Sequence, residues 1–261
     1  MNAPMPLNEG EIHLWLTHDR EIRDPALLET YHRLLSPEET RQQQRFHFEK
    51  DRHQYLITRA LVRTTLSRYA PIAPEDWQFE KLEHGRPRIL NPHPQAQSLT
   101  FNLTHTAGLI VLGIQRNGEL GIDTENIQER EAPLDVSHRY FSPRERADLH
   151  ALPKAAQNER FFHYWTLKEA YIKARSKGLS LPLDQFSFTW PTEDRLELHF
   201  DQGLPDKPER WQCWLLQATP AHLLALCSSR QPNERKLTLQ QIVPLSPAPP
   251  TPKEIVVLRR H

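Results

Sequence analysis

Cysteine is scarce in this sequence of 261 residues, in which only Cys213 and Cys227 occur. Two cysteines without a Cys-x-x-Cys pair exclude a framework of disulfides and a zinc site with four cysteine ligands. Such low use of cysteine suits a reducing compartment. We interpret both thiols as ordinary core side chains rather than reactive groups.

An excess of one charge is also absent, because Lys and Arg together number 33, as do Asp and Glu. The isoelectric point near 7.3 therefore gives no general reason to expect a nucleic acid as partner. The N-terminus lacks a basic region followed by an apolar run, and no window approaches about 18 apolar residues. These absences predict a soluble, cytoplasmic protein that does not insert into a membrane.

Two hydrophobic periodicities occur along the chain and together predict an α+β fold. Apolar residues at helical spacing predict long helices over residues 51–69 and 159–174. Alternating residues and short apolar runs separated by turns predict strands, several of them antiparallel. The predicted strands cover residues 11–16, 77–80, 99–105, 109–114, 119–125, 186–190, 196–200, 211–216, 223–227 and 236–243.

One helix-start pattern occurs twice, as Ser36-Pro37-Glu38-Glu39 and, 106 residues later, as Ser142-Pro143-Arg144-Glu145. In both places serine caps the helix, proline takes the first helical position and glutamate follows three residues after the serine. A long helix and a strand with alternating aromatic residues follow each start. This order indicates a duplicated α+β unit, although two unrelated capped helices would give the same spacing.

We therefore divide the chain into an N-terminal half, residues 1–115, and a C-terminal half, residues 116–230. A strand-like return over residues 231–243 follows. Residues 244–261 begin with a proline-rich stretch, which predicts a flexible tail.

The segment Gly121-Ile122-Asp123-Thr124-Glu125 places two carboxylates on one predicted strand. Residues two apart share a face, so Asp123 and Glu125 point the same way and repel each other unless a cation lies between them. Oxygen ligands of this kind suit Mg²⁺ or Mn²⁺, which often bind substrate phosphates as well. The alternative is the solvated edge of a strand, the commoner role of an isolated Asp-x-Glu.

A second charged pair, Glu169 and Lys173, shares one face of an otherwise apolar helix. A buried Glu169 needs either a metal ion or a positive charge, and a salt bridge with Lys173 is the simpler partner. Thr104 and His105 follow a strand and can reach a phosphate, but a capped turn with an exposed histidine is the commoner arrangement.

Other signals are weaker. Arg86 and Pro87 after Gly85, together with Lys50, offer further cationic and backbone contacts. The sequence contains no Walker loop, Rossmann glycine fingerprint, zinc-ligand spacing or nucleophile elbow. From the residues alone, the interpretation stops at a magnesium-dependent site that acts on a phosphate-containing ligand.

Four motifs, taken in order, resemble the 4′-phosphopantetheinyl transferases of the longer, surfactin-synthetase-activating type. The likeness runs from about Leu35 to Phe188. The motifs are Gly85-Arg86-Pro87, Phe101-Asn102-Leu103-Thr104-His105, Gly121-Ile122-Asp123-Thr124-Glu125 and Trp165-Thr166-Leu167-Lys168-Glu169-Ala170-Tyr171-Ile172-Lys173.

The resemblance implies two similar α+β halves in one chain, related by pseudo-twofold symmetry. Each half would have a mostly antiparallel sheet and a long helix, with the active cleft between the halves. It also implies transfer of the phosphopantetheine arm of coenzyme A to a serine hydroxyl of an apo acyl, peptidyl or aryl carrier protein. The reaction releases 3′,5′-ADP and serves fatty acid, polyketide or nonribosomal peptide biosynthesis.

By the same resemblance, Asp123, Glu125 and Glu169 bind Mg²⁺ together with the coenzyme A pyrophosphate. Glu169, or a water that it holds, removes the serine proton, and Lys173 stabilises charge on the departing phosphate.

The residues that match coenzyme A contacts of the family are Lys50, Arg86, Pro87, Thr104, His105, Asp123 and Lys173. The sequence departs from the family pattern at three positions. Thr104 stands where serine is commoner, Arg86 where lysine is commoner, and Ser176 where glycine is frequent.

Two other classes of function compete with a monomeric transferase. A non-catalytic carrier-protein or nucleotide-binding module could keep the fold, but intact Asp123, Glu169 and Lys173 argue against it. A metal-dependent phosphohydrolase would explain the carboxylates but not the Thr-His and Trp-x-x-Lys-Glu spacings.

Overall fold

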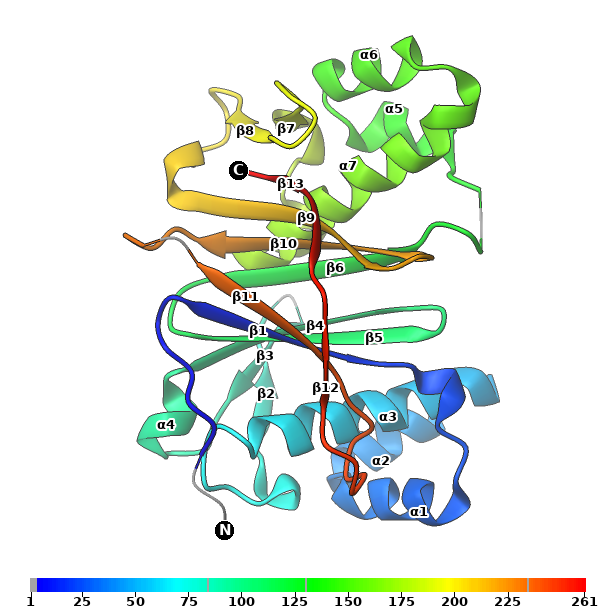
Figure 1. The fold of residues 1–261 in the computed structure, drawn as a ribbon, viewed down its shortest axis with the longest axis vertical. Helices are drawn as coiled ribbons and strands as arrows, with labels where there is room; N and C mark the ends of the chain where they lie inside the picture. Colours follow the sequence, from blue (N-terminus) through cyan, green and yellow to red (C-terminus); the bar gives the residue numbers. More distant parts are fainter. Residues whose placement is uncertain (1–3, 84, 130, 234) are drawn as a thin grey trace. The chain divides into compact units, whose positions relative to one another are not determined.

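The computed structural model describes residues 4–83, 85–129, 131–233 and 235–261. Its helices and strands form two compact units, each made of segments that are not contiguous in sequence (Figure 1). Unit 1 comprises Met1–Phe101, Gly108–Asn117 and Lys236–Lys253, and unit 2 comprises Asn102–Ala107, Gly118–Arg235 and Glu254–His261. Both units combine helices with mainly antiparallel sheets, which confirms the predicted α+β class.

Unit 1 contains β1 (Glu11–Thr17), α1 (Pro25–Leu34), α2 (Pro37–Gln44), α3 (Glu49–Leu66), β2 (Phe79–Lys81), β3 (Pro87–Ile89), α4 (Pro94–Gln97), β5 (Leu109–Arg116), β11 (Lys236–Gln241), β12 (Thr251–Lys253) and the first part of β4 (Leu99–Thr106). Its largest sheet has the order β12, β11, β1, β5, β4, while β2 and β3 form a separate pair. β1 pairs antiparallel with β5 and parallel with β11, so Leu14 lies beside both Gly113 and Leu239. The buried apolar residues of β1 and β5 place the core of unit 1 between this sheet and α3.

Unit 2 contains β6 (Leu120–Asn126), α5 (Ser137–Tyr140), α6 (Pro143–Ala151), α7 (Lys154–Arg175), β7 (Phe186–Thr189), β8 (Glu197–Phe200), β9 (Trp211–Thr219), β10 (His222–Ser229) and β13 (Val256–Arg260). Its main sheet has the order β13, β9, β10, β6, and β7 pairs with β8. The expected division of the chain between residues 115 and 116 stays a prediction. The two units are not contiguous in sequence, since unit 1 includes Lys236–Lys253 and unit 2 includes Asn102–Ala107.

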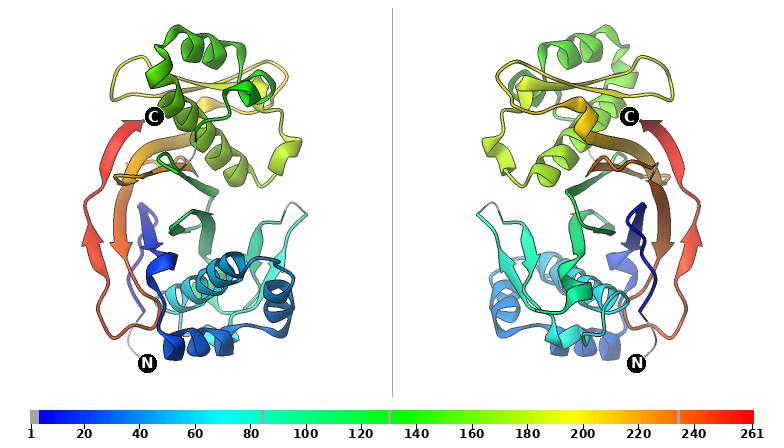
Figure 2. Two further views of the ribbon diagram at one scale, coloured as in Figure 1. Left: turned by 90° about the vertical axis from the view of Figure 1, so that its right-hand side faces the viewer. Right: turned by 90° about the vertical axis from the view of Figure 1, so that its left-hand side faces the viewer.

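Helix α7 lies along one face of the β9, β10, β6 part of this sheet (Figure 2). The Tyr171 ring on α7 lies 4.7 Å from that of Phe186 and 5.3 Å from that of Trp211, measured between centroids. Burial of each large apolar side chain contributes roughly 1.5–3 kcal/mol, so this aromatic core holds α7 on the sheet.

The two predicted helix starts are confirmed as reciprocal caps. Ser36 accepts a hydrogen bond from the Glu39 amide while the Glu39 carboxylate accepts one from the Ser36 amide, and Ser142 and Glu145 do the same. Each cap satisfies two amides that the first turn of a helix leaves without partners.

Several boundaries differ from the sequence prediction. Helix α7 begins at Lys154, because the residues before 159 are good helix formers although they lack apolar periodicity. The strand predicted over residues 77–80 begins only at Phe79, since a 3₁₀ turn over Pro74–Asp76 precedes it. His84, Arg130 and Glu234 lie outside the described residues, and Glu234 belongs to the predicted strand-like return over residues 231–243.

The prediction of a flexible tail over residues 244–261 is wrong for Thr251–Lys253 and Val256–Arg260, which form strands. Thr251–Lys253 forms β12 on the edge of the unit 1 sheet, and Val256–Arg260 forms β13 on the edge of the unit 2 sheet. The pairing uses backbone groups of β11 and β9, which composition does not reveal. Pro252 is tolerated because an edge strand has one row of amides without a strand partner.

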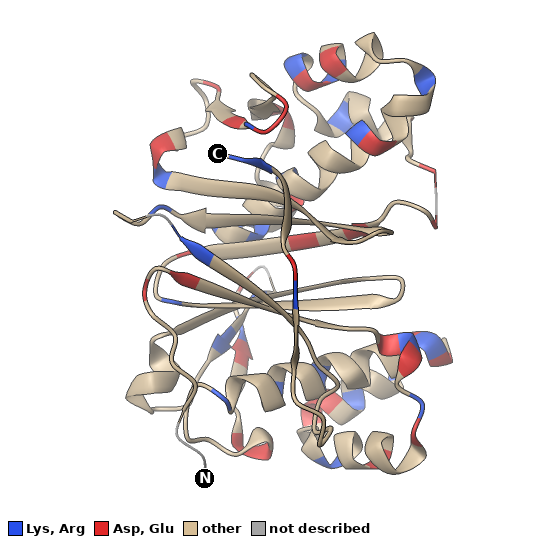
Figure 3. Ribbon diagram, in the orientation of Figure 1, with Lys and Arg blue, Asp and Glu red and all other residues tan. Residues whose placement is uncertain are grey.

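Charged side chains of both signs are interspersed along the helices of each unit (Figure 3). This mixture agrees with the formal net charge of zero. No helix in the described part of the chain combines the length and apolar character needed to span a bilayer.

Candidate active site

Asp123 lies on β6, the strand that packs against α7. In the pairing with β10, Gly121 lies beside Cys227 and Asp123 beside Ala225, and both partners belong to the core of unit 2. A β-carbon at Gly121 would lie 2.0 Å from the carbonyl oxygen of Ala170 on α7. Glycine at this position therefore lets α7 approach β6 closely and brings the helix to the Asp123 carboxylate.

Side chains from β4 take the place of a neighbouring strand along β6. Asn102, Thr104 and Thr106 accept hydrogen bonds from three β6 amides at 2.9, 3.2 and 3.4 Å, respectively. These amides belong to Ile122, Thr124 and Asn126. Because β6 is the last strand of its sheet, the side chains satisfy amides that no further strand covers. The same arrangement fixes the Thr104 hydroxyl next to Asp123.

Lys173, Asp123 and Thr104 form one hydrogen-bonded cluster. The Lys173 ammonium donates to Asp123 Oδ1 at 2.6 Å and to the Thr104 hydroxyl at 3.3 Å. The Thr104 hydroxyl donates to the same carboxylate oxygen at 3.1 Å. The side chain of Lys173 is 28% exposed and that of Asp123 10% exposed, so a ligand can reach the ammonium from solvent.

Glu169 lies one helical turn before Lys173 and is electrostatically coupled to this cluster. Burial raises the pKa of Glu169 above 4.5, the negative charge of Asp123 raises it further, and the charge of Lys173 opposes the shift. In the part of the chain that the structure describes, Lys173 forms its ion pair with Asp123 and not with Glu169. The salt bridge between Glu169 and Lys173, one of the two alternatives from the sequence, is therefore not formed.

The carboxylates suit a hard cation in their chemistry, although the predicted three-ligand set is not assembled. Within residues 4–83, 85–129, 131–233 and 235–261, no group of three His, Cys, Asp or Glu side chains lies close enough to hold a metal ion. The negative charge of Asp123 nevertheless contributes to the raised pKa of Glu169, so the two carboxylates repel each other. A cation bound between them would relieve this repulsion. Asp123 and Glu169 thus fit Mg²⁺, while Glu125 is half-buried on the same face of β6 and its role stays a prediction.

Comparison with known proteins gives the family of the chain. The family model of the 4′-phosphopantetheinyl transferase superfamily matches residues 119–227, and that of the N-terminal part of 4′-phosphopantetheinyl transferases matches residues 24–116. A 4′-phosphopantetheinyl transferase of Bacillus subtilis is 32% identical over 195 residues, which is 75% of this chain and 82% of the relative. The chain belongs to the 4′-phosphopantetheinyl transferase superfamily.

Two further members of this superfamily are similar over most of their length. The 4′-phosphopantetheinyl transferase Sfp of Bacillus subtilis is 29% identical over 211 residues, covering 81% of this chain and 89% of Sfp. The 4′-phosphopantetheinyl transferase HetI of Nostoc sp. is 30% identical over 180 residues, covering 67% of this chain and 73% of HetI. The family and the enzyme class that the four motifs implied are confirmed.

The positions predicted to bind coenzyme A in this transferase are only partly brought together. Thr104 lies in the cluster with Asp123 and Lys173, and His105 follows it with an exposed side chain. Lys50 is exposed in the first turn of α3, where its ammonium lies 5.8 Å from the centroid of the Phe48 ring.

Unit 1 of this transferase has a cavity of about 670 Å³. Pro87 lines this cavity, and it also lines a smaller one of about 190 Å³ together with Arg86. The larger volume lies in the range of small-molecule sites.

Reasoning from the sequence missed three residues that shape the site of this transferase: Asn102, Gly121 and Lys168. Asn102 belongs to the period-two series of polar residues on β4, and this alternation was the available signal. For Gly121 no local signal exists, because its need arises from the approach of α7. Lys168 belongs to the motif on α7, and its fully buried side chain is paired with Glu145, 23 positions earlier in the chain.

Proposed function

We propose that this transferase moves the 4′-phosphopantetheine arm of coenzyme A to a serine hydroxyl of an apo acyl, peptidyl or aryl carrier protein. The observation that carries the proposal is the cluster of Thr104, Asp123 and Lys173 with Glu169 beside it, in a chain that belongs to this superfamily. An oxygen–phosphorus bond forms at the serine, the bond to the leaving 3′,5′-ADP breaks, and the serine proton passes to a base.

Glu169, or a water that it holds, is our choice for that base. Burial and the charge of Asp123 raise its pKa, which makes the Glu169 carboxylate a stronger proton acceptor than an exposed glutamate. Lys173 carries the positive charge of the cluster and is partly exposed. We assign to it the stabilisation of negative charge on the departing phosphate.

We further propose Mg²⁺, or Mn²⁺ in its place, held by Asp123 and Glu169, with Glu125 as a third ligand. Such a cation, when bound, neutralises charge on the pyrophosphate of coenzyme A. The support is the oxygen donor set and the coupling of the two acids, which burial leaves with excess negative charge.

For the nucleotide end of coenzyme A we propose the cavity of about 670 Å³ in unit 1. It is lined by the aromatic rings of Tyr55 and Phe79 and by Arg41 and Lys81, which suit a flat base and phosphate groups. Acidic side chains line it as well, so an increase in KM for coenzyme A in Arg41→Ala is the test of this assignment. Lys50, Arg86, Pro87, Thr104 and His105 remain predicted coenzyme A contacts.

The remaining expectations are also proposals. We infer that the two halves of the chain derive from a duplicated α+β unit with pseudo-twofold symmetry and that the enzyme acts as a monomer. The repeated helix caps at Ser36 and Ser142 support the duplication. The free thiols Cys213 and Cys227 fit the reducing cytoplasm.

The test is incubation of the protein with coenzyme A, Mg²⁺ and apo carrier proteins of several classes, followed by mass spectrometry of the carriers. The expected result is a gain of one phosphopantetheine arm on at least one class and the release of 3′,5′-ADP. An unchanged mass on every carrier would overturn the proposed function. Transfer that persists without divalent cations would overturn only the proposal of a metal ion.

A further inference from the structure

Lys168 lies next to Glu169 on α7, but its side chain is fully buried. Its ammonium forms an ion pair at 2.8 Å with Glu145 of α6, and both side chains are 0% exposed. A lysine that is closed off in this way cannot touch coenzyme A or a carrier protein. Its effect on the site must therefore pass through the protein.

The bonds of Lys168 and Glu145 join three segments of unit 2. The Lys168 ammonium donates to the carbonyl oxygens of Leu183 at 2.6 Å and Phe186 at 2.7 Å, so all three of its donors are used. The Glu145 carboxylate accepts from the amides of Ser142 and Phe188, each at 2.9 Å. The pair thus fixes α7 to the start of α6 and to the chain segment that enters β7.

Stability alone does not account for a buried ion pair. Burial raises the pKa of Glu145 and lowers that of Lys168, and the charge of each opposes the shift of the other. Apolar residues in place of such a pair are often no less stabilising, because removing two charges from water is costly. Directional bonds, by contrast, add specificity to the apolar packing, because they are satisfied in only one rotation of a helix about its axis.

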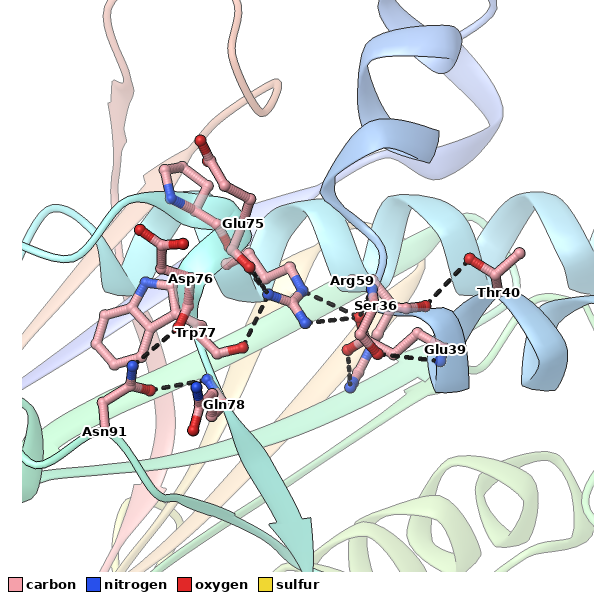
Figure 4. A network of polar contacts seen from close by, with 11 residues as sticks. Ser36, Glu39, Thr40, Arg59, Glu75, Asp76, Trp77, Gln78 and Asn91 are labelled. Atoms are coloured by element: carbon pink, nitrogen blue, oxygen red, sulfur yellow. Dashed lines mark hydrogen bonds and ion pairs between the residues drawn. The ribbon is translucent and has the colours of Figure 1, made fainter.

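The same arrangement occurs in unit 1, where Glu39 of α2 binds Arg63 of α3. Figure 4 shows the polar network around Glu39. Glu39 is again the capping glutamate, and Arg63 donates to its carboxylate at 2.7 and 3.0 Å. Arg63 also donates to the carbonyl oxygens of Pro74 and Trp77, each at 3.0 Å, in the segment that leads into β2. The residue after Arg63 is Thr64, whereas the residue after Lys168 is Glu169. The arrangement in unit 1 therefore exists without a neighbouring carboxylate. What the two arrangements share is the placement of a long helix.

Successive residues of an α-helix differ by about 100° around the axis. A rotation of α7 that broke the bonds of Lys168 would turn Glu169 and Lys173 by the same angle. We propose that Lys168 is a positioning residue, which rests on the proposed function: its bonds to Glu145, Leu183 and Phe186 hold α7 in the rotation that directs Glu169 and Lys173 toward Asp123.

The test compares Lys168→Met with the double variant Glu145→Gln/Lys168→Met. The single variant leaves a buried carboxylate without its counter-charge, so its unfolding midpoint should fall. The double variant carries no buried charge and should regain most of that loss. Its kcat should nevertheless stay roughly tenfold or more below that of the wild type, with KM for coenzyme A little changed, because small misplacements of reacting groups cost up to about 100-fold.

Arg160→Met is the matched control, because Arg160 also ties α7 to α6, through Asp148, but lies about two turns from Glu169. It should lower the unfolding midpoint and leave kcat near that of the wild type. Recovery of kcat together with the midpoint in the double variant would overturn the proposal. So would an equal loss of kcat in Arg160→Met, since that would indicate general loosening of the two helices.

A crystal structure of the double variant separates this proposal from the proposed function. Loss of the 2.6 Å contact between Lys173 and Asp123 supports positioning even if the wild type transfers nothing to any carrier. An unchanged contact and an unchanged α7 would overturn it, whatever the activity.

Discussion

The ammonium of Lys173 lies 2.6 Å from Oδ1 of Asp123, and both side chains come from elements that pack directly together. The cation of the motif on α7 therefore neutralises the carboxylate of the motif on β6, not the glutamate of its own helix. Glu169 has no ion pair with Lys173 in the described part of the chain, and burial and the negative charge of Asp123 raise its pKa. This division of roles among the three residues leads to the following predictions.

Asp123→Asn removes the charge that binds Lys173 and keeps the size of the side chain. We expect transfer to a carrier protein to fall by at least about a hundredfold, the usual loss when a group that organises transition-state charge is removed. The rate is measured by mass spectrometry of the carrier, and circular dichroism checks that the fold is intact. A folded variant with near-normal transfer would remove Asp123 from the site.

Glu169→Gln should change stability in a pH-dependent manner. Because the pKa of Glu169 is raised, the folded state binds its proton more tightly than the unfolded state. The stabilisation by this group is complete below its ordinary pKa of 4.5 and is lost as the pH rises through the folded-state value. The neutral glutamine should therefore raise the free energy of unfolding at neutral pH and have little effect below pH 4.5.

Urea denaturation at these two pH values measures this difference. Transfer should fall in the same variant, so the residue would weaken the fold while serving the reaction. Equal effects at both pH values would show that the charge of Glu169 is not the cause.

Ser176→Gly should stabilise the protein. Ser176 ends α7 in the left-handed conformation, with φ of 53°, which glycine adopts at little cost. A side chain in this conformation costs about 1–2 kcal/mol, which is partly offset by the greater flexibility of glycine in the unfolded chain. We expect a gain of roughly 0.5–1 kcal/mol in urea denaturation. A loss of stability would mean that the serine side chain makes a contact worth more than the strain.

How far the sequence predicts this site depends on which contacts are local. The Ser-Pro-x-Glu caps and the face shared by Asp123 and Glu125 follow from spacing within one element. The partner of Lys173 does not, because the bond to Asp123 joins residues that are 50 positions apart. Spacing within the helix offered Glu169 instead, and only the packing of α7 on β6 decides between them.

The end of the chain was predicted poorly for a related reason. Strand β12 contains Pro252 and follows a proline-rich stretch, a composition typical of a disordered segment, whereas Val256 and Val257 of β13 are strand formers that the prediction overlooked. The structure of both strands comes from pairing with β11 and β9, which supply the hydrogen bonds. Lys168 shows the same limit, since its ion pair joins it to Glu145, which lies 23 positions earlier in the chain.

Gly121→Ala should separate α7 from β6. The added β-carbon would lie 2.0 Å from the Ala170 carbonyl oxygen and 2.2 Å from the Ala174 nitrogen, and both are backbone atoms of α7. Overpacking of this kind costs about 1–3 kcal/mol, and the shift of the helix should lower transfer as well. Gly10→Ala is the control, because nothing lies within 4 Å of its added carbon. Equal unfolding midpoints for the two variants would contradict the close approach.

Thr104→Val tests whether the hydroxyl beside Asp123 serves the reaction or only the fold. The variant leaves the Thr124 amide without its acceptor and removes the bond to Oδ1 of Asp123. Thr106→Val is its matched control, because Thr106 also accepts a hydrogen bond from a β6 amide, that of Asn126. Thr104→Val should lose about 1–3 kcal/mol of stability, the cost of a buried amide left without a partner, and Thr106→Val should lose less, because the Asn126 amide is only partly buried.

Only Thr104→Val should also lower the rate of transfer, since only its hydroxyl touches Asp123 and Lys173. Thr104→Ser, which keeps the hydroxyl, should retain the rate even where it loses stability through the missing methyl group. Should Thr106→Val slow transfer as much as Thr104→Val, the polar residues of β4 act only by holding β6 in place. If transfer slows in Thr104→Val but not in Thr104→Ser or Thr106→Val, the Thr104 hydroxyl is one of the groups that set the charge of Asp123.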